Sequence, residues 1–295
     1  MSYNRRSFLK LSATFTSGLA FIKISNSLAS CNTTSGIDAI NQDFGLQLYT
    51  LRDEMPKDPR GVLRQVASFG YKQLESYEHN QLGMFWGMEP AEFKNYVEGL
   101  GMRITASHAG IYKDFERKAG EAGSIGMHYL ICPWIGPQKR LDDYKKAADK
   151  FNECGEICKR NGLRFAYHNH DYTFKPLEGQ IPQDVLMQNT GADIVDYEMD
   201  IYWVVTAGQD PLTWFNKYPN RFTLGHIKDR IKDAPASETG ATTILGTGSI
   251  DYNKILKEAS SKGMKYYFVE QEHYAGTTPI DAARANAEFM KNLKL

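Results

Sequence analysis

Pairs of ionisable residues recur at one short spacing in the second half of this sequence. Four such pairs stand two positions apart: His168 with His170, Glu198 with Asp200, His226 with Lys228, and Glu270 with Glu272. Residues two apart on a β-strand point to the same face, so each pair would present both side chains together. Imidazole nitrogens and carboxylate oxygens suit a divalent first-row ion such as Mn, Co, Zn or Fe, with positions left open for substrate oxygens.

A single histidine at a strand end is usually a hydrogen-bonded structural residue, and we interpret His273 in that way. The set of pairs favours a metal instead, because several unpaired charges gathered in one place are costly without a cation.

Short runs rich in β-forming residues alternate with longer helical patterns from residue 44 onward, as in βα units with a parallel sheet. The predicted strands are residues 45–49, 71–76, 103–107, 129–132, 164–169, 194–199, 222–227 and 266–271. Glycines that end the preceding helix stand before four of them: Gly70, Gly101, Gly162 and Gly263. Such glycines are typical of helix C-termini.

Eight units without an internal linker predict a single (β/α)8 TIM barrel, preceded by an export signal. The alternative is an open doubly wound sheet, which would have a glycine-rich turn after the first strand, and residues 48–53 contain no glycine. In barrels the chemistry lies at the carboxyl ends of the strands. Further polar or aromatic residues expected at those ends are Glu75, Glu78, His108, Trp134 and Asp196.

Five segments together resemble the xylose-isomerase-like TIM barrel family, which includes sugar phosphate isomerases and epimerases and inosose dehydratases. The resemblance covers about residues 44–295 and is carried by GLQLYTLR at 45–52, YHNHD at 167–171, MDIYW at 199–203, GHIKD at 225–229 and VEQE at 269–272. It implies a metal held by a strand-five carboxylate, a strand-six aspartate, a strand-seven histidine and a strand-eight glutamate.

The resemblance assigns Asp200, His226 and Glu270 as metal ligands. At the strand-five position His168 stands where the epimerases have glutamate, with His170 as the neighbouring alternative. The metal set is therefore His168, Asp200, His226 and Glu270, and the catalytic set is Glu270, His168 and His170. The remaining polar or aromatic residues at strand ends are assigned to substrate binding: His108, Trp134, Lys228 and Glu272. The pair Tyr202-Trp203 offers further apolar faces to a sugar ring.

The implied function is a divalent-metal-dependent isomerase or epimerase that abstracts a proton next to the carbonyl of a sugar or keto-sugar. Replacing one carboxylate base by an imidazole equally suits a lyase, either by inosose-type dehydration or by β-elimination of a 3-keto-glycoside. An alternative of another class is a lipid-tethered sugar-binding protein without catalysis, and a third is an interaction scaffold with neither metal nor ligand.

Two further features have weaker interpretations. Lys228 could be a Schiff-base nucleophile, but a lysine two residues from a metal-binding histidine more often binds substrate oxygens or a carboxylate. The segment 245–249, with Gly246 and Gly248, follows strand seven, where barrels often bind phosphate. Because an exported enzyme rarely meets phosphorylated sugars, we expect an unphosphorylated substrate.

The chain has 295 residues with 35 Lys and Arg against 35 Asp and Glu, and 42% of its residues are hydrophobic, as in a soluble globular protein. No strongly basic stripe is present, so nucleic-acid binding is not expected. A small-molecule sugar is the expected partner. A homo-oligomer stays open, because the apolar helix faces are those expected of helices that pack on a barrel and carry no information on dimers.

The first thirty residues contain Arg5, Arg6 and Lys10 before a stretch of small and apolar residues, as in a twin-arginine export signal. A membrane-spanning anchor is less consistent, because the apolar run falls short of about 20 residues. The segment 28–31 resembles a lipobox ending at Cys31, which would anchor the protein to a membrane by lipid. Ordinary cleavage with Cys31 incidental is the alternative. The predicted parts are thus a signal at 1–30, a tether at 31–42 and a barrel at 43–295, in a periplasmic or membrane-tethered protein.

Three further cysteines, Cys132, Cys154 and Cys158, are an odd number in an exported chain and imply no disulfide framework. Packing inside the protein is their expected role.

Overall fold

The computed structural model describes residues 43–293, which form a closed barrel of parallel strands in the order β1-β10-β7-β6-β5-β4-β3-β2. The strands are β1 (Gly45–Gln47), β2 (Gln73–Tyr77), β3 (Arg103–His108), β4 (Tyr129–Cys132), β5 (Arg164–His168), β6 (Val195–Asp200), β7 (Phe222–Ile227) and β10 (Tyr266–Val269). The barrel closes where Gly45 pairs with Phe268 and Leu46 with Val269. The predicted (β/α)8 barrel is confirmed, and the open doubly wound sheet is excluded.

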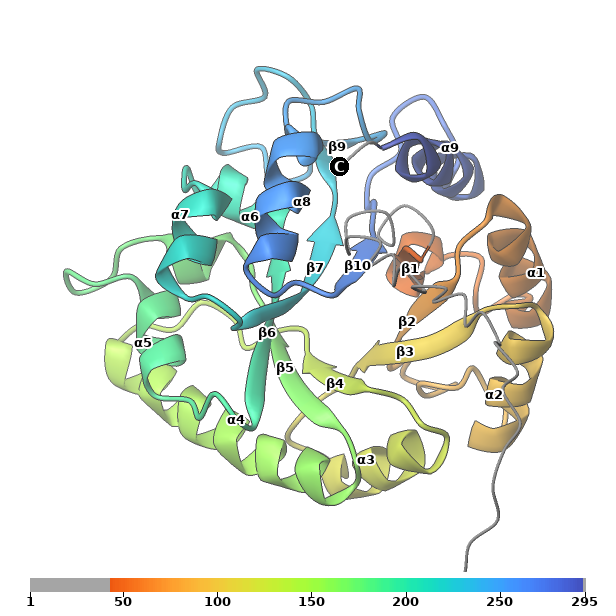
Figure 1. Ribbon diagram of the computed structural model, residues 1–295, viewed down its shortest axis with the longest axis horizontal. Helices are drawn as coiled ribbons and strands as arrows, with labels where there is room; N and C mark the ends of the chain where they lie inside the picture. Colours follow the sequence, from red (N-terminus) through yellow and green to blue (C-terminus); the bar gives the residue numbers. More distant parts are fainter. Residues whose placement is uncertain (1–42, 294–295) are drawn as a thin grey trace, which may run out of the picture. The chain divides into compact units, whose positions relative to one another are not determined.

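Helices surround the ring of strands (Figure 1). They are α1 (Pro59–Phe69), α2 (Pro90–Gly99), α3 (Phe115–Ser124), α4 (Leu141–Arg160), α5 (Pro182–Gln188), α6 (Ile201–Thr206), α7 (Pro211–Lys217), α8 (Tyr252–Ser261) and α9 (Pro279–Asn292), with short 3-10 turns at Leu48–Leu51 and Asp171–Phe174. The Asp58 side chain accepts a hydrogen bond from the Gly61 amide at the start of α1, and Gly70 ends that helix with a φ of 102°. The φ value requires a left-handed conformation, which confirms the expected glycine cap.

Half of the barrel strand boundaries coincide with prediction, and the others differ by one or two residues. The clearest change is in β1, which ends at Gln47 instead of residue 49. The Gln47 side chain accepts a hydrogen bond from the Tyr49 amide and so caps a 3-10 turn that takes the chain out of the sheet. Tyr49 is consequently placed above the barrel.

Two apolar clusters lie on the two faces of the strands. The larger cluster fills the space between the strands and the helices. The smaller one comprises Ala106, Tyr129, Ile131, Ala166, Leu224 and Phe268, and it lies inside the barrel. Side chains alternate along a strand, so the residues two positions further on continue the inner face toward the carboxyl ends.

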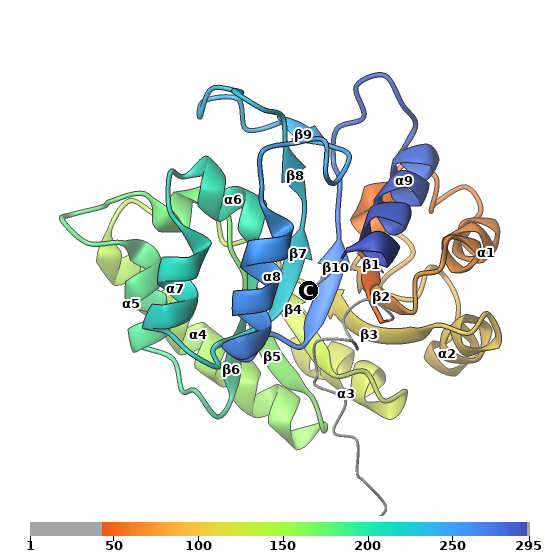
Figure 2. The same ribbon diagram turned by 45° about the horizontal axis from the view of Figure 1, so that its top comes forward.

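A two-stranded antiparallel hairpin follows β7, formed by β8 (Asp229–Arg230) and β9 (Thr242–Thr243). Figure 2 shows this hairpin extending beyond the end of β7.

Cys132, Cys154 and Cys158 are buried and unpaired with one another, as expected for packing residues. Burial raises the pKa of the Cys132 and Cys154 thiols to about 12. Among the residues that the structure describes, no helix combines the length and apolar character needed to cross a membrane. The predicted export signal, the cysteine at position 31 and the tether lie outside the described residues and stay predictions.

Candidate metal centre and active-site cavity

Along the inner face of the barrel, an apolar residue is followed two positions later by an ionisable one in four strands. His108 follows Ala106, His168 follows Ala166, His226 follows Leu224, and Glu270 follows Phe268, each by two residues. Their side chains therefore stack on the inner apolar cluster at the carboxyl ends of β3, β5, β7 and β10.

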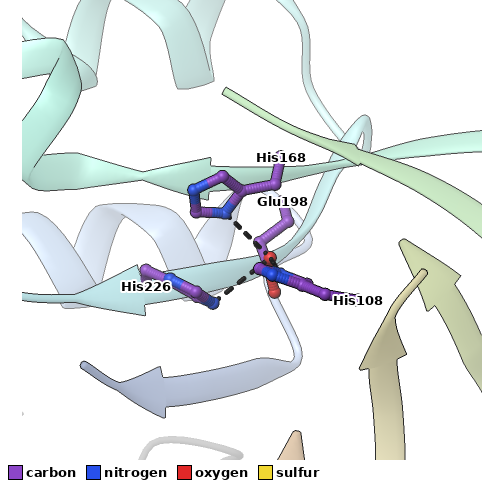
Figure 3. A group of neighbouring side chains, drawn as sticks. All are labelled: His108, His168, Glu198 and His226. Atoms are coloured by element: carbon purple, nitrogen blue, oxygen red, sulfur yellow. Dashed lines mark hydrogen bonds and ion pairs between the residues drawn. The ribbon is translucent and has the colours of Figure 1, made fainter. Parts of the chain in front are cut away.

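Three histidines surround one oxygen of Glu198 (Figure 3). Glu198 Oε2 lies 2.9 Å from His108 Nε2, 3.0 Å from His168 Nδ1 and 3.2 Å from His226 Nε2. Two of these imidazoles also contact Glu75, whose Oε1 lies 3.0 Å from His108 Nε2 and 2.7 Å from His226 Nε2. All five side chains are buried.

A second group shares His226 through its other nitrogen. His226 Nδ1 lies 3.1 Å from Glu270 Oε2 and 3.9 Å from Asp200 Oδ2. Lys228 Nζ lies between the same carboxylates, 3.0 Å from Asp200 Oδ2 and 2.6 Å from Glu270 Oε2, and it also contacts Glu272 Oε1 at 2.5 Å. The ammonium thus neutralises the carboxylates that would otherwise repel one another.

Burial and neighbouring charges separate the protonation states of the histidines. Burial alone would lower the pKa of His108, but the carboxylates of Glu75 and Glu198 outweigh it and raise the pKa to about 9. The pKa of His226 is raised well above its usual range by Glu198, Glu270 and Glu75 in the same way. Burial lowers the pKa of His168 well below its usual range. The cluster therefore contains both charged and neutral imidazoles.

The pKa values of the Glu198 and Glu270 carboxyl groups are shifted in opposite directions. Burial and the nearby Glu75 charge raise the pKa of Glu198 to about 8. Burial would also raise the pKa of Glu270, but Lys228 and His226 outweigh it and hold that pKa well below the usual range. Glu270 is therefore ionised at neutral pH.

Several buried carboxylate oxygens in this region lack a full set of hydrogen-bond partners. Within the described residues, Glu75 Oε2 and Glu198 Oε1 are buried and form no hydrogen bond, and Asp200 Oδ2 faces the Lys228 ammonium at 3.0 Å. Two groups of side chains bring their donor atoms within 4.8 Å of one another: His108, His168, Glu198 and His226 form one, and Asp200, His226 and Glu270 form the other. Either group could hold a divalent ion, because buried oxygens without partners are costly unless a ligand or ion compensates them.

The structure brings the four residues of the predicted metal set close to one another. His226 contacts both Asp200 and Glu270, and His168 Nε2 lies 3.7 Å from Asp200 Oδ2. His170 follows the end of β5, where its Nδ1 is buried without a hydrogen bond. Burial and the Lys228 charge lower the pKa of His170 to about 3, so this imidazole is neutral.

Two members of the cluster, Glu75 and Glu198, received no role from the sequence, although both were expected at strand ends. The signal that could have identified Glu198 is its same-face pairing with Asp200. For Glu75 the signal is its place on β2, where it pairs in register with Gln47 and Ala106. Which of the many strand-end acids meet one another depends on the barrel register.

Asp196 was expected at the carboxyl end of β6, and that expectation is wrong. Asp196 is the second residue of β6, so it lies toward the opposite end of the barrel. There it binds the Arg164 side chain and accepts a hydrogen bond from the Tyr129 hydroxyl at 2.9 Å. His273 is exposed and is absent from both donor groups found among the described residues.

The segment with Gly246 and Gly248 does not present free amides to a phosphate. The amides of Gly246 and Gly248 donate to Asp229 Oδ2 at 2.9 and 3.0 Å, and the Ile250 amide donates to Asp229 Oδ1 at 3.1 Å. Asp229 is buried, so its carboxylate already occupies the place of an anion.

Lys228 has the wrong electrostatics for a Schiff-base nucleophile. Burial would lower its pKa, but Asp200, Glu270 and Glu272 outweigh burial and raise the pKa well above the usual range. A nucleophilic lysine needs a lowered pKa.

A cavity of about 720 Å³ opens above the cluster. Its buried end is lined by His108, His168, His170 and Glu270, and Glu272 lies beside them. Trp134 lines the outer part, with its ring edge-on to His170 at a centroid distance of 4.5 Å. The structure therefore provides a cavity that joins ionisable groups to aromatic surfaces, as small-molecule sites usually do.

Comparisons with known proteins agree with this architecture. The family model of the xylose isomerase-like TIM barrel matches residues 63–293. A sugar phosphate isomerase/epimerase from Parabacteroides distasonis has a TM-score of 0.73 and 28% identity, with 92% of this chain and 98% of that chain covered. The IOLI protein, solved with a bound zinc atom, shares the fold at a TM-score of 0.70 and 14% identity over 86% of this chain and 99% of that one.

Among curated proteins, the inosose dehydratase of Clostridium beijerinckii is 28% identical over 165 residues, which are 51% of this chain and 54% of that protein. The chain thus spans about half the length of the curated relatives it matches.

Proposed function

The chain belongs to the xylose isomerase-like TIM barrel family, and from that premise we propose that it is a divalent-metal-dependent enzyme of the isomerase or epimerase type. Its substrate would be an unphosphorylated sugar or keto-sugar, and its reaction would begin with removal of a proton next to the carbonyl. The observation that carries the proposal is the placement of Glu270 and His170, on two separate strand ends, along one cavity above a His and carboxylate cluster.

The residues present fit a divalent ion. Asp200, His226 and Glu270 are buried and bring one ligand atom each within 4.8 Å of one another, and the two carboxylates already attract a cation there, the Lys228 ammonium. We assign these three residues as ligands, with His168 as the fourth. A bound divalent ion would polarise a sugar carbonyl and an adjoining hydroxyl and so stabilise enediolate charge.

Glu270 and His170 approach a bound sugar from β10 and β5, which β7 and β6 separate in the barrel. Glu270 is ionised and can accept a proton from carbon, whereas His170 is neutral, and its unpaired Nδ1 can form a hydrogen bond with a sugar hydroxyl. The two groups would thus hold a sugar from two sides while Glu270 removes and returns its α-proton.

Elimination is the second candidate, and specific observations favour it. The strand-five position holds an imidazole instead of a carboxylate, and relatives 26–30% identical to this chain are named inosose dehydratases. In this reaction Glu270 would take the α-proton, the C–H electrons would form the new double bond, and the β-oxygen would leave with a proton from Lys228, which contacts Glu272.

Proton exchange tests both versions. Metal-reconstituted protein would be incubated in D2O with a panel of keto-sugars and 3-keto-glycosides, and NMR would follow deuterium at the α-carbon. We expect exchange that requires the metal and is lost in the Asp200→Ala, His226→Ala double variant. A product that keeps the carbon skeleton but has a new configuration or a carbonyl at another carbon indicates epimerisation or isomerisation. An unsaturated product indicates elimination. Turnover of a sugar without α-exchange would contradict both.

The same assay distinguishes the proposed enzyme from a non-catalytic sugar-binding protein. Such a protein would bind sugar without exchange and would contain no metal after reconstitution. Metal content near one equivalent in the parent protein, absent from the double variant, would support the enzyme.

A further inference from the structure

Exposed aromatic side chains are concentrated at the cavity. Four large apolar side chains are exposed in the part of the chain that the structure describes, and three of them line the cavity: Tyr49 at 39%, Tyr112 at 75% and Trp134 at 53%. The fourth, Ile231, lies outside it. Single exposed apolar residues are normal on a protein surface, but their gathering around one opening marks a binding surface.

Two of the three rings are held in place although they face water. The Trp134 ring is edge-on to His170 and to Tyr172, with centroid distances of 4.5 and 4.9 Å. The Tyr49 ring is edge-on to Tyr77 at 5.2 Å and lies 4.9 Å from the Arg52 guanidinium carbon. A ring fixed before binding loses little entropy when a ligand packs against it.

The aromatic residues come from different parts of the barrel mouth. Tyr49 follows β1, Tyr112 follows β3, and Trp134 follows β4. They stand at the outer part of a cavity whose inner part is formed by buried His108, His168 and Glu270. A sugar held at the inner groups would leave its attached group beside the aromatic rings.

The cavity has more room than one sugar ring fills. Its volume of about 720 Å³ lies in the upper part of the usual range of about 300–1,000 Å³ for ligand pockets. A substrate of two linked rings would use both the polar inner part and the aromatic outer part.

The outer part is not built for a phosphate. Buried Lys118 lines it, but its ammonium binds Glu78 Oε2 at 2.7 Å and the Gly110 carbonyl at 3.0 Å. The other lysine that lines the cavity, Lys113, is exposed to solvent. The attached group should therefore be neutral and should have an apolar face.

We propose that Tyr49, Tyr112 and Trp134 form a second subsite, which binds the neutral ring joined to the reacting sugar. The substrate class is then glycosides whose reacting sugar carries a keto group and is joined to a second sugar or to an aryl group, and not free monosaccharides. The assignment of the inner part to the reacting sugar rests on the proposed function, whereas the outer subsite is tested by binding alone.

Isothermal titration calorimetry on the full chain tests the subsite. The probes are glucose, methyl β-glucoside, phenyl β-glucoside and cellobiose, with galactose, methyl β-galactoside, phenyl β-galactoside and lactose as the second series. In at least one series, we expect a ring-bearing glycoside to bind about tenfold more tightly than the methyl glycoside. A stronger phenyl glycoside indicates an aryl substituent, and a stronger disaccharide indicates a second sugar.

Tyr112→Ala is the informative variant, because a side chain that is 75% exposed contributes little to folding. The substitution should weaken binding of the ring-bearing glycoside about three- to tenfold and leave the affinity for the methyl glycoside unchanged. Ile231→Ala is the matched control, because it removes an exposed apolar residue outside the cavity, and it should leave every affinity unchanged.

Ring-bearing glycosides that bind no better than methyl glycosides, or that do not bind at all, would overturn the subsite. So would a Tyr112→Ala variant that keeps every affinity but turns a dimer into a monomer in sedimentation, because the aromatics would then belong to a subunit interface. If the protein exchanges the α-proton of keto-monosaccharides but does not bind the ring-bearing glycosides, the subsite is refuted and the proposed function is not. Tyr112-dependent glycoside binding without any exchange would refute the proposed function alone.

Discussion

Lys228 is the residue whose surroundings most constrain the chemistry of the centre. Its ammonium contacts Asp200, Glu270 and Glu272, so a positive charge already lies where two of the proposed metal ligands converge. When Asp200 and Glu270 bind a divalent ion, Glu272 remains available to Lys228. Lys228 serves as the internal counter-ion of these carboxylates without metal, and in the proposed enzyme it would be a positioned acid once metal binds.

The Lys228→Met variant should be unstable chiefly in the metal-free state. Removing one partner of a buried ion pair costs about 3–5 kcal/mol, because the remaining charges stay uncompensated. We expect a large drop in the free energy of unfolding with EDTA and a smaller drop with metal bound, measured by urea titration. Lys139→Met, at an exposed position, is the control and should change neither. Equal losses in both states would contradict the counter-ion role.

Asp200 allows its structural and ligand roles to be separated. Its Oδ1 accepts a hydrogen bond from the Trp203 amide at 3.1 Å and so caps α6, whereas its Oδ2 lies 3.0 Å from Lys228 Nζ, which also has Glu270 and Glu272 as partners. Asparagine caps helices as well as aspartate does, but it is a neutral and weaker metal ligand.

Asp200→Asn should therefore keep the metal-free melting temperature within a few degrees of the parent. Its metal affinity should fall at least about tenfold, as measured by equilibrium dialysis with elemental analysis. Asp200→Ala should lose both the affinity and the cap. An asparagine variant with undiminished metal content would assign the ion to the other group, His108, His168, Glu198 and His226.

At the scale of elements, the packing of the outer helices decides whether a glycine in a helix can be replaced by alanine. Gly99 lies in α2, and no atom lies within 4 Å of the place that a Cβ would take there. A Cβ on Gly123 in α3 would instead overlap the Asn161 carbonyl oxygen at the end of α4. The two glycines look alike in the sequence but face different surroundings.

Gly99→Ala should raise the free energy of unfolding by up to about 0.5–1 kcal/mol, because alanine loses less backbone entropy on folding. Gly123→Ala should lower it by about 1–3 kcal/mol, because α3 must move away from the end of α4. Thermal and chemical denaturation of the pair provides the measurement. A destabilised Gly99→Ala variant, or a neutral Gly123→Ala variant, would disagree with the packing described.

At the scale of the whole molecule, the barrel and the candidate centre lie entirely within residues 43–293. The predicted signal at 1–30, with Arg5 and Arg6, and the predicted lipid attachment site at Cys31 lie outside those residues. We propose an exported, membrane-tethered protein, an assignment that rests on the sequence of that segment.

Cell fractionation tests that assignment. In a bacterial host with a twin-arginine pathway, we expect the parent protein in the membrane fraction with a lipid-modified Cys31 detected by mass spectrometry. Cys31→Ser should lose the lipid, and the Arg5→Lys, Arg6→Lys double variant should stay in the cytoplasm. Unprocessed parent protein in the cytoplasm would contradict the export signal.

The sequence by itself determined the class of fold, because strand and helix periodicity, glycine caps and strand-end polarity are local properties. Every predicted barrel strand begins within two residues of the observed start, and six starts coincide with it: Gly45, Arg103, Tyr129, Arg164, Phe222 and Tyr266. The same-face pairs of His226 with Lys228 and of Glu270 with Glu272 also follow from two-residue alternation alone.

The tertiary structure decided which of these groups meet. Glu75 and His226 are 151 positions apart in sequence and 2.7 Å apart in space, and this contact depends on the closure and register of the whole barrel. The same long-range packing brought Arg164 against Asp196 and the amides of Gly246 and Gly248 against the Asp229 carboxylate. Local sequence fixes the face on which a side chain lies, but only the closed sheet fixes its neighbours across the barrel.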